Sequence, residues 1–324
     1  MEKKVFYFNI TYRCNERCVF CGADSQAGSK EAAAYRVKDL SMQEFMKSLR
    51  DIGVSENDDI RISGGEPSLH PNFLEIIAGA GESGSSVWVS TTASYFANPN
   101  HLGRLDEKHR CLFDVRLYAH RPDLHDELTR TPGSFSRTVK GLRNLIALRK
   151  EQQFSYTVGV RLLLARQTLP YLAETALFAI HELKMDSVCV IMLIESESTH
   201  RSSAFFPMLR ARQEIARLFR AVGENRRLSL TGLPLCILPR ELALKEISGG
   251  DSGRARNPKG DHDVFYYHDT LSGSKPKKIY NNQEELYNPM PQSCICCNAH
   301  NYCAGLPKWY WTEFGDTESL GFDV

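Results

Sequence analysis

The stretch Val5-Phe-Tyr-Phe-Asn-Ile-Thr-Tyr-Arg-Cys14-Asn-Glu-Arg-Cys18-Val-Phe-Cys21 joins an apolar run to three closely spaced cysteines. The apolar and aromatic residues predict a buried β-strand, and the cysteines follow its carboxyl end. The spacing C-x3-C-x2-C allows three thiolates from one loop to bind a cubane iron-sulfur cluster, leaving its fourth iron open to another ligand. A zinc knuckle is the alternative, but zinc prefers four closed ligands and no fourth cysteine or histidine lies nearby.

The pattern that follows this stretch predicts the fold. Apolar runs and amphipathic stretches alternate through the first 230 residues, which is typical of βα units around a parallel sheet. Strands are expected to begin at Val5, Ile60, Val87, Leu112, Tyr156 and Val188. Helices are expected from the capping box Ser41-x-x-Glu44 to about Ile52, and from Leu169 to Leu183. Six such units predict an α/β fold, a partial (β/α)6 TIM-like barrel, over residues 1–230.

A second motif, Gly64-Gly65-Glu66-Pro67, follows the second expected strand. Loops at the carboxyl ends of parallel strands converge. This turn and the cysteines are therefore expected to lie together at that edge of the sheet, here called the rim. Glycines allow the backbone to approach a ligand closely, and a carboxylate pairs with an ammonium group. An ordinary Gly-Pro turn is the simpler alternative for this motif taken alone.

The two motifs together resemble the radical S-adenosylmethionine (SAM) superfamily, in which an aromatic residue precedes the third cysteine, as Phe20 does here. The resemblance implies a 4Fe-4S cluster on Cys14, Cys18 and Cys21, with SAM bound to the open iron through its amino and carboxylate groups. It also implies that one electron cleaves SAM to methionine and a 5′-deoxyadenosyl radical, which abstracts a hydrogen atom from the substrate.

The same resemblance suggests which residues contact SAM. The amino group is expected at the second motif, where the candidates are Ser63, Gly64, Gly65 and Glu66. Three arginines are candidates for the SAM carboxylate: Arg116, Arg130 and Arg161. A solvated or structural charge is the competing interpretation of each arginine.

The C-terminal part of the chain has a different composition. From about Ile247 to Ser293 the sequence is rich in Gly, Ser, Asn, Lys and Pro. Two β-like patches, Val264–His268 and Lys277–Tyr280, flank Leu271-Ser-Gly-Ser274, which predicts a hairpin. We therefore expect a small C-terminal β-hairpin/helix iron-sulfur domain over residues 231–324.

A second cysteine cluster lies in this domain. Cys294, Cys297 and Cys303 form C-x2-C-x5-C, and Cys236, which precedes the hairpin, is the best candidate for a fourth ligand. The arrangement resembles the auxiliary-cluster (twitch or SPASM) domain of radical SAM maturases, which implies one auxiliary 4Fe-4S cluster on these four residues. A structural zinc ribbon remains the alternative.

Three further cysteines have no assigned ligand role. Cys296 is a bystander thiol, a substitute ligand or a hydrogen-atom donor to a substrate radical. Cys189 and Cys111 lie in expected strands, where a free cysteine usually acts as a small buried hydrophobe, and each is also a candidate hydrogen donor.

Composition limits the partners and the location. The 324 residues carry a formal net charge of +1, so no general attraction to nucleic acid or to an anionic membrane is expected. No apolar run is long enough to predict a membrane span. Ten cysteines, gathered mainly near the two ends, suit metal binding in a reducing compartment, which predicts a cytoplasmic protein.

The leading functional hypothesis from the resemblance is an oxidoreductase that oxidises, epimerises or cross-links a peptide, as maturases of ribosomally made peptides (RiPPs) do. The alternative is a dehydrogenase or epimerase acting on a small molecule such as a sugar, an aminocyclitol or an amino acid. Either needs a one-electron reductant such as flavodoxin or ferredoxin. A non-catalytic iron-sulfur or zinc scaffold is disfavoured, because the Gly-Gly-Glu-Pro motif accompanies the first cysteines.

Overall fold

The structure, a computed structural model, divides the chain into two compact units. The first unit comprises Met1–Leu117, Arg121–Gly159 and Asp261–Tyr280, and the second comprises Tyr118–His120, Val160–Gly260 and Asn281–Val324. The residues described are 4–21, 39–192, 204–223, 225, 227–241, 243, 255–256, 263–267, 277–279, 294, 297, 303, 305–306 and 308–314.

Parallel strands and helices alternate along the first unit. Its elements in chain order are β1 (Lys4–Thr11), α3 (Met42–Ile52), β2 (Asp59–Gly64), α4 (Phe73–Gly81), β3 (Ser86–Thr91), α5 (Pro99–Leu102), β4 (Cys111–Arg116), α6 (Pro122–Thr129), α7 (Ser134–Gln152), β9 (Asp263–Tyr267) and β10 (Lys277–Ile279). Strand β5 (Thr157–Leu164) begins in this unit and ends in the second.

The second unit continues the alternation. Its elements are α8 (Leu172–Leu177), β6 (Ser187–Met192), α9 (Met208–Val222), β7 (Leu228–Thr231), β8 (Ala255–Arg256) and α13 (Lys308–Phe314). Strand β7 pairs in parallel with β6 and with β8.

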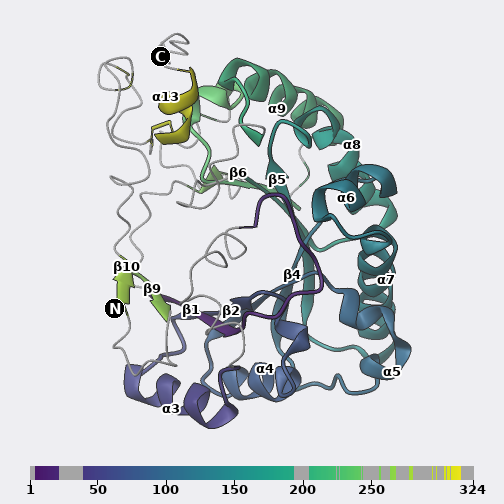
Figure 1. Ribbon diagram of the computed structural model, residues 1–324, viewed down its shortest axis with the longest axis vertical. Helices are drawn as coiled ribbons and strands as arrows, with labels where there is room; N and C mark the ends of the chain where they lie inside the picture. The colour runs from purple at the N-terminus through teal and green to yellow at the C-terminus, as the bar shows by residue number, and fades with distance from the viewer. Residues whose placement is uncertain are drawn as a thin grey trace. The chain divides into compact units, whose positions relative to one another are not determined.

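The sheet of the first unit has one apolar face. Strand β1 pairs in parallel with β2, β2 with β3, and β3 with β4. Alternate residues of β1, Phe6, Phe8 and Ile10, are at most 2% exposed. The ring of Phe8 meets that of Phe45 on α3 edge to face, with the centroids 5.0 Å apart. Figure 1 shows helices α3 and α4 along this side of the strands.

The predicted α/β class is confirmed. All six predicted strand starts lie within one residue of those observed. Ser41 caps α3 in the expected capping box with Glu44. The stretch from Leu169 is helical in three segments rather than in one α-helix, and it begins with a short 3-10 turn that contains Pro170. A seventh parallel strand, β7, was not predicted, because four residues give too short a pattern.

The predicted C-terminal hairpin is confirmed as an antiparallel pair of β9 and β10. The backbone of β9 also pairs in parallel with β1, so the hairpin extends the sheet of the first unit. The predicted domain boundary at residue 231 stays a prediction, and the two compact units divide the chain elsewhere.

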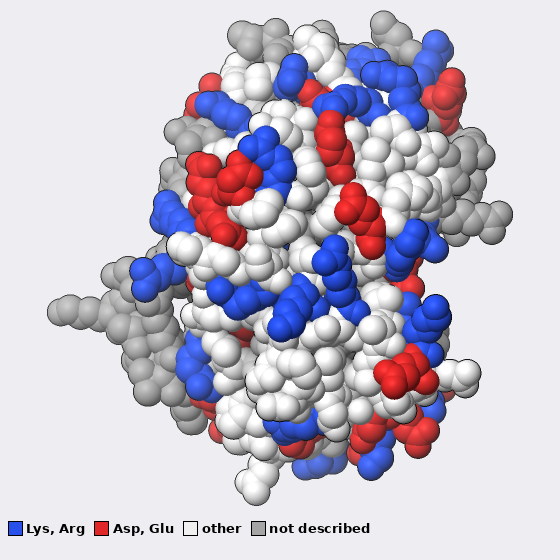
Figure 2. All heavy atoms as spheres, turned by 90° about the vertical axis from the view of Figure 1, so that its right-hand side faces the viewer, with Lys and Arg blue, Asp and Glu red and all other residues white. Residues whose placement is uncertain are grey.

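The charged side chains of the surface are of both signs. Figure 2 shows Lys and Arg side chains interspersed with Asp and Glu on the face drawn, as expected for a net charge near zero. Among the described residues, no helix combines the length and the apolar character needed to cross a membrane.

Gly141 brings α7 against the loop that follows β3. A Cβ atom added at Gly141 would lie 2.0 Å from the carbonyl oxygen of Ala93. We expect Gly141→Ala to lower the free energy of unfolding by about 1–3 kcal/mol through overpacking, although alanine is the better helix former.

Urea denaturation of the two proteins would measure this difference. Gly103→Ala is the matched control, because a Cβ atom there meets nothing within 4 Å. Equal losses in the two variants would show that the close approach of α7 does not require glycine.

Candidate functional site

The first cysteine loop lies on the C-terminal end of α6. The amide of Arg17 donates to the carbonyl of Thr129 at 3.0 Å, and the amide of Val19 donates to that of Leu128 at 2.8 Å. The last carbonyls of a helix have no partner within it, so the loop supplies donors that these groups need. The backbone of the cysteine loop is thus held by a neighbouring helix.

The three cysteines lie at the surface of the first unit. Cys14 is exposed, Cys18 and Cys21 are half-buried, and the ring of Phe20 between them is buried. Desolvation of the sulfur raises the pKa of Cys14 to about 11, and the carboxylates of Glu66 and Glu16 act in the same direction. Iron binding must therefore displace a proton from the Cys14 thiol.

The two motifs are joined by backbone hydrogen bonds. The amide of Gly65 donates to the carbonyl of Thr11 at 2.8 Å, and the amide of Glu66 donates to that of Arg13 at 2.7 Å. A Cβ atom at Gly64 would lie 2.1 Å from the Thr11 oxygen, and one at Gly65 would lie 2.3 Å from the Arg13 oxygen. The glycines are therefore required by the neighbouring cysteine loop, in addition to any contact with SAM.

Glu66 is an internal anchor of this rim. Its side chain is fully buried, and its carboxylate accepts four hydrogen bonds. The donors are the Ser68 amide at 3.2 Å and hydroxyl at 2.5 Å, the Thr91 hydroxyl at 2.5 Å and the Thr92 amide at 2.7 Å. The predicted pairing of this carboxylate with the SAM ammonium stays a prediction.

Thr91 and Thr92 were not among the residues expected at the site. They fix the end of β3 through Glu66, and Thr138 on α7 donates its hydroxyl to the Thr92 carbonyl at 2.9 Å. In the sequence, only the position of Thr91-Thr92-Ala93 after the third strand could have indicated that these residues belong to the site.

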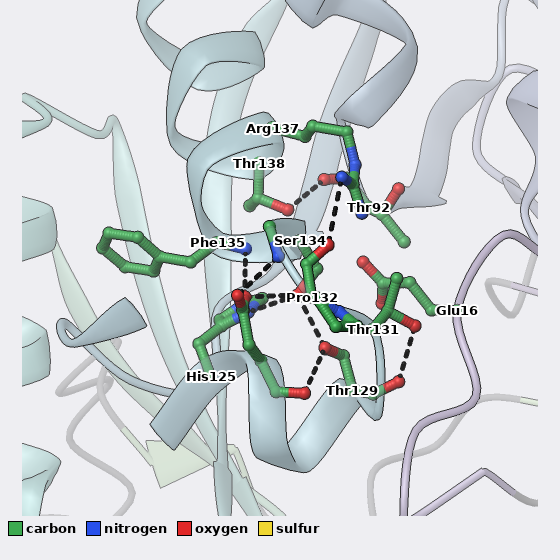
Figure 3. A network of polar contacts seen from close by, with 12 residues as sticks. Glu16, Thr92, His125, Thr129, Thr131, Pro132, Ser134, Phe135, Arg137 and Thr138 are labelled. Atoms are coloured by element: carbon green, nitrogen blue, oxygen red, sulfur yellow. Dashed lines mark hydrogen bonds and ion pairs between the residues drawn. The ribbon is translucent and has the colours of Figure 1, made fainter. Parts of the chain in front are cut away.

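Asp126 ties α6 to α7. Its carboxylate accepts from the Gly133 amide at 2.6 Å, the Phe135 amide at 2.8 Å and the Ser134 hydroxyl at 2.9 Å. Figure 3 shows Ser134 and Phe135, two of these donors, in the same region as Thr129, the residue whose carbonyl accepts from the cysteine loop. The cap of α7 and the support of the cysteine loop thus share one small network.

Charged side chains lie around Glu16, within the cysteine loop. The Cys18 thiol donates to the Glu16 carboxylate at 3.3 Å. Burial raises the pKa of Glu16 to about 7, although the hydrogen bond and the charges of Arg116 and Arg137 oppose this rise. Figure 3 shows Glu16 and Arg137 in the same region.

The three predicted arginines lie on different elements. Arg116, at the end of β4, and Arg130, just after α6, belong to the first unit and are exposed. Arg161 on β5 belongs to the second unit. Arg137 was missed by the sequence analysis, and its charge acts, with that of Arg116, on Glu16 in the cysteine loop.

The second set of cysteines lies in the second unit. Cys236, in the turn after β7, has Cys303, Cys294 and Cys297 as neighbours, and burial with these thiols raises its pKa. The Cys303 sulfur accepts the amides of Leu235 at 3.3 Å and Gly305 at 3.4 Å. The structure therefore brings the four predicted ligands together.

The remaining cysteines differ in their surroundings. Cys111 is buried on β4, where desolvation raises the pKa of its thiol. Cys189 is half-buried on β6, with its sulfur 3.5 Å from the Thr231 hydroxyl. Cys296 lies outside the described residues.

Both sets of cysteines have ligand chemistry that fits iron-sulfur clusters. Among the described residues, no group of three or more His, Cys, Asp or Glu side chains is arranged to hold a single metal ion. In a cubane each thiolate binds a different iron, so the sulfurs need not converge on one point.

A comparison with known families decides the identity of the first unit's site. Residues 8–179, more than half of the chain, match the radical SAM superfamily. The chain belongs to the radical SAM superfamily. Its cofactors are therefore a 4Fe-4S cluster and SAM.

Curated relatives of this radical SAM protein carry different activities. The chain is 26% identical over 194 residues, 60% of its length, to the Fe-coproporphyrin III synthase of Methanosarcina barkeri. It is 25% identical over 155 residues, 47% of its length, to the GTP 3′,8-cyclase of Vibrio vulnificus. The matched region spans 45% of each of these relatives.

A solved structure matches the whole fold of this radical SAM protein. Streptococcus suis SuiB, bound to its precursor peptide SuiA, superposes with a TM-score of 0.63 at 14% sequence identity. The match covers 99% of this chain and 74% of that chain.

Loss of one acceptor at Glu66 should destabilise the rim. In Glu66→Gln one carboxylate oxygen becomes an amide that cannot accept, so one or more buried donors lose their partner. We expect the free energy of unfolding to fall by about 1–3 kcal/mol, as measured by urea denaturation. Glu75→Gln, at an exposed glutamate paired with Arg104, is the control and should change little.

His125 should make stability depend on pH. Burial lowers its pKa from 6.5 to about 4. Between these values the unfolded chain binds the proton and the folded chain does not, so stability falls as pH drops through this range. At about 1.4 kcal/mol per pKa unit, the advantage of wild type over His125→Gln should shrink by about 2 kcal/mol from pH 7.5 to pH 5. An unchanged difference would contradict a neutral, buried His125.

Proposed function

We propose that this radical SAM protein is a peptide-modifying oxidoreductase, of the kind that matures ribosomally made peptides. The observation that carries the proposal is the fold likeness to SuiB over 99% of this chain, since SuiB is seen with its precursor peptide bound. The four neighbouring cysteines of the second unit add support, because they suit an auxiliary 4Fe-4S cluster.

The residues of the first unit have distinct tasks in this proposal. Cys14, Cys18 and Cys21 would hold the catalytic cluster, on a loop fixed by α6. The backbone at Gly64 and Gly65 would orient the SAM amino group, and Arg116 and Arg137 would attract the SAM carboxylate. Cluster and SAM together supply a 5′-deoxyadenosyl radical that abstracts hydrogen, and the protein orients the reactants and excludes water.

The second unit would hold the auxiliary cluster through Cys236, Cys294, Cys297 and Cys303. A cluster there would take or relay an electron, or contact the substrate. A one-electron reductant such as flavodoxin or ferredoxin would serve the first cluster. Two such clusters, together with the free thiols, would suit a reducing, cytoplasmic location.

A small-molecule substrate is the second candidate. Two curated relatives support it, because their names, Fe-coproporphyrin III synthase and GTP 3′,8-cyclase, indicate small-molecule substrates. Each is matched over part of its length. A short peptide encoded beside this gene would supply the substrate for a direct test. Modification of that peptide, seen as a mass change only when SAM and reductant are present, would favour the maturase.

The two sets of cysteines should separate in a SAM-cleavage assay. Replacing Cys14, Cys18 and Cys21 by alanine should abolish the formation of 5′-deoxyadenosine and remove about four irons per chain. Replacing Cys294, Cys297 and Cys303 should also remove about four irons, yet spare SAM cleavage while stopping turnover of the substrate.

Anaerobic reconstitution, iron analysis and chromatography of 5′-deoxyadenosine provide these measurements. Cys111→Ala is the control, because its buried thiol belongs to neither set. Equal loss of cleavage in both triple variants would overturn the division into two clusters, and zinc in place of iron at the second set would overturn the auxiliary cluster.

A further inference from the structure

A cluster of two aromatic rings and one arginine lies on the sheet face of the first unit opposite its apolar face. Tyr7 on β1, Arg61 on β2 and Trp88 on β3 are direct neighbours in register. Side chains alternate between the two faces of a strand, so these three point away from the side that carries Ile60 and Ile62. All three are half-buried.

The two rings hold the guanidinium group in place. The central carbon of the Arg61 guanidinium lies 5.2 Å from the ring centroid of Tyr7 and 4.9 Å from that of Trp88. One terminal nitrogen, Nη1, also donates to the Tyr7 hydroxyl at 2.7 Å. Cation–π contacts on two sides and this hydrogen bond restrict the rotamers of a normally flexible side chain.

One edge of the guanidinium is left without a partner. The Nε atom is buried and makes no hydrogen bond. The nitrogen beside it, Nη2, donates no hydrogen bond to the residues that the structure describes. A buried donor without a partner costs free energy.

The geometry of this edge selects the ligand. The Nε–H and Nη2–H groups point the same way and form a planar fork, which matches the two oxygens of a carboxylate. We propose that Arg61 binds a carboxylate group of the substrate, with Tyr7 and Trp88 as the walls that hold the fork. The substrate would be a carboxylate-bearing peptide or small molecule.

The position along β2 fits this assignment, which rests on the proposed function for its link to catalysis. Arg61 lies three residues before Gly64, so a carboxylate at its fork would lie about 10 Å along the strand from the second motif. Ser63, a predicted SAM contact, is the next residue on the same face. A substrate anchored at Arg61 would thus extend toward the SAM end of the strand.

Binding can be tested without knowing the substrate. N-acetylglycine serves as the carboxylate probe, N-acetylglycinamide as its neutral match and methyl phosphate as a tetrahedral anion. Tryptophan fluorescence reports binding, since Trp88 lies against the fork, and Trp88→Phe confirms the origin of the signal. We expect saturable binding of the acid in the millimolar range, weaker binding of methyl phosphate and none of the amide.

Three variants separate recognition from structure. Arg61→Lys keeps the charge and loses the fork, and Arg61→Gln loses the charge as well. Both should weaken binding of the acid at least about tenfold, whereas Arg104→Gln should not. Arg104 is the matched control, because it also donates to a tyrosine hydroxyl but is exposed and paired with Glu75. Arg61→Lys should stay folded, as circular dichroism would show.

The outcomes distinguish this inference from the proposed function. The titrations use oxidised, reconstituted protein and need no turnover, while SAM cleavage is measured separately. Cleavage of SAM without selective binding of the acid would overturn the carboxylate site alone. Equal binding of acid and amide, tighter binding of methyl phosphate, or wild-type affinity in Arg61→Gln would each do the same. Selective binding without SAM cleavage would leave the site in place and overturn the enzyme.

Discussion

The backbone pairing between the cysteine loop and the glycine turn is the constraint on which the rest of the site depends. Two amides of the turn, at Gly65 and Glu66, reach the carbonyls of Thr11 and Arg13 only because no Cβ atom intervenes. The cysteines and the second motif are therefore one continuous structure, although about 45 residues separate them in sequence. The carboxylate of Glu66 extends this structure to β3 and, through Thr92 and Thr138, to α7.

Much of the fold was predictable, because it depends on local patterns. Apolar runs located the starts of six strands to within one residue, and the capping box at Ser41 located the start of α3. The short strand β7 was not predicted, since four residues are too few to establish the alternation of apolar and polar residues that marks a strand. The pairing of β9 with β1 joins residues more than 250 positions apart, and no local pattern reports such a contact.

The two groups of neighbouring cysteines could be found from the sequence, whereas the residues that support them could not. Both sets of thiols could be located because most of their cysteines are closely and characteristically spaced in the sequence. The side chains that position them, such as Thr91, Asp126 and Arg137, are common polar residues whose role depends on what the fold brings to them. Arg61 illustrates the same limit, since its importance comes from rings on two neighbouring strands.

The support of the cysteine loop by α6 has a consequence for electron transfer. The amides of Arg17 and Val19 donate to helix carbonyls, so they are not available to donate to the sulfurs of a cluster. Hydrogen bonds to sulfur are one of the means by which a protein sets the reduction potential of a cluster, because they stabilise the added negative charge. With these two amides engaged, a reduced cluster held by the three cysteines would receive fewer hydrogen bonds from this loop and would be less stabilised. The loop would thus favour a low reduction potential for that cluster, which suits the one-electron reduction of a sulfonium ion.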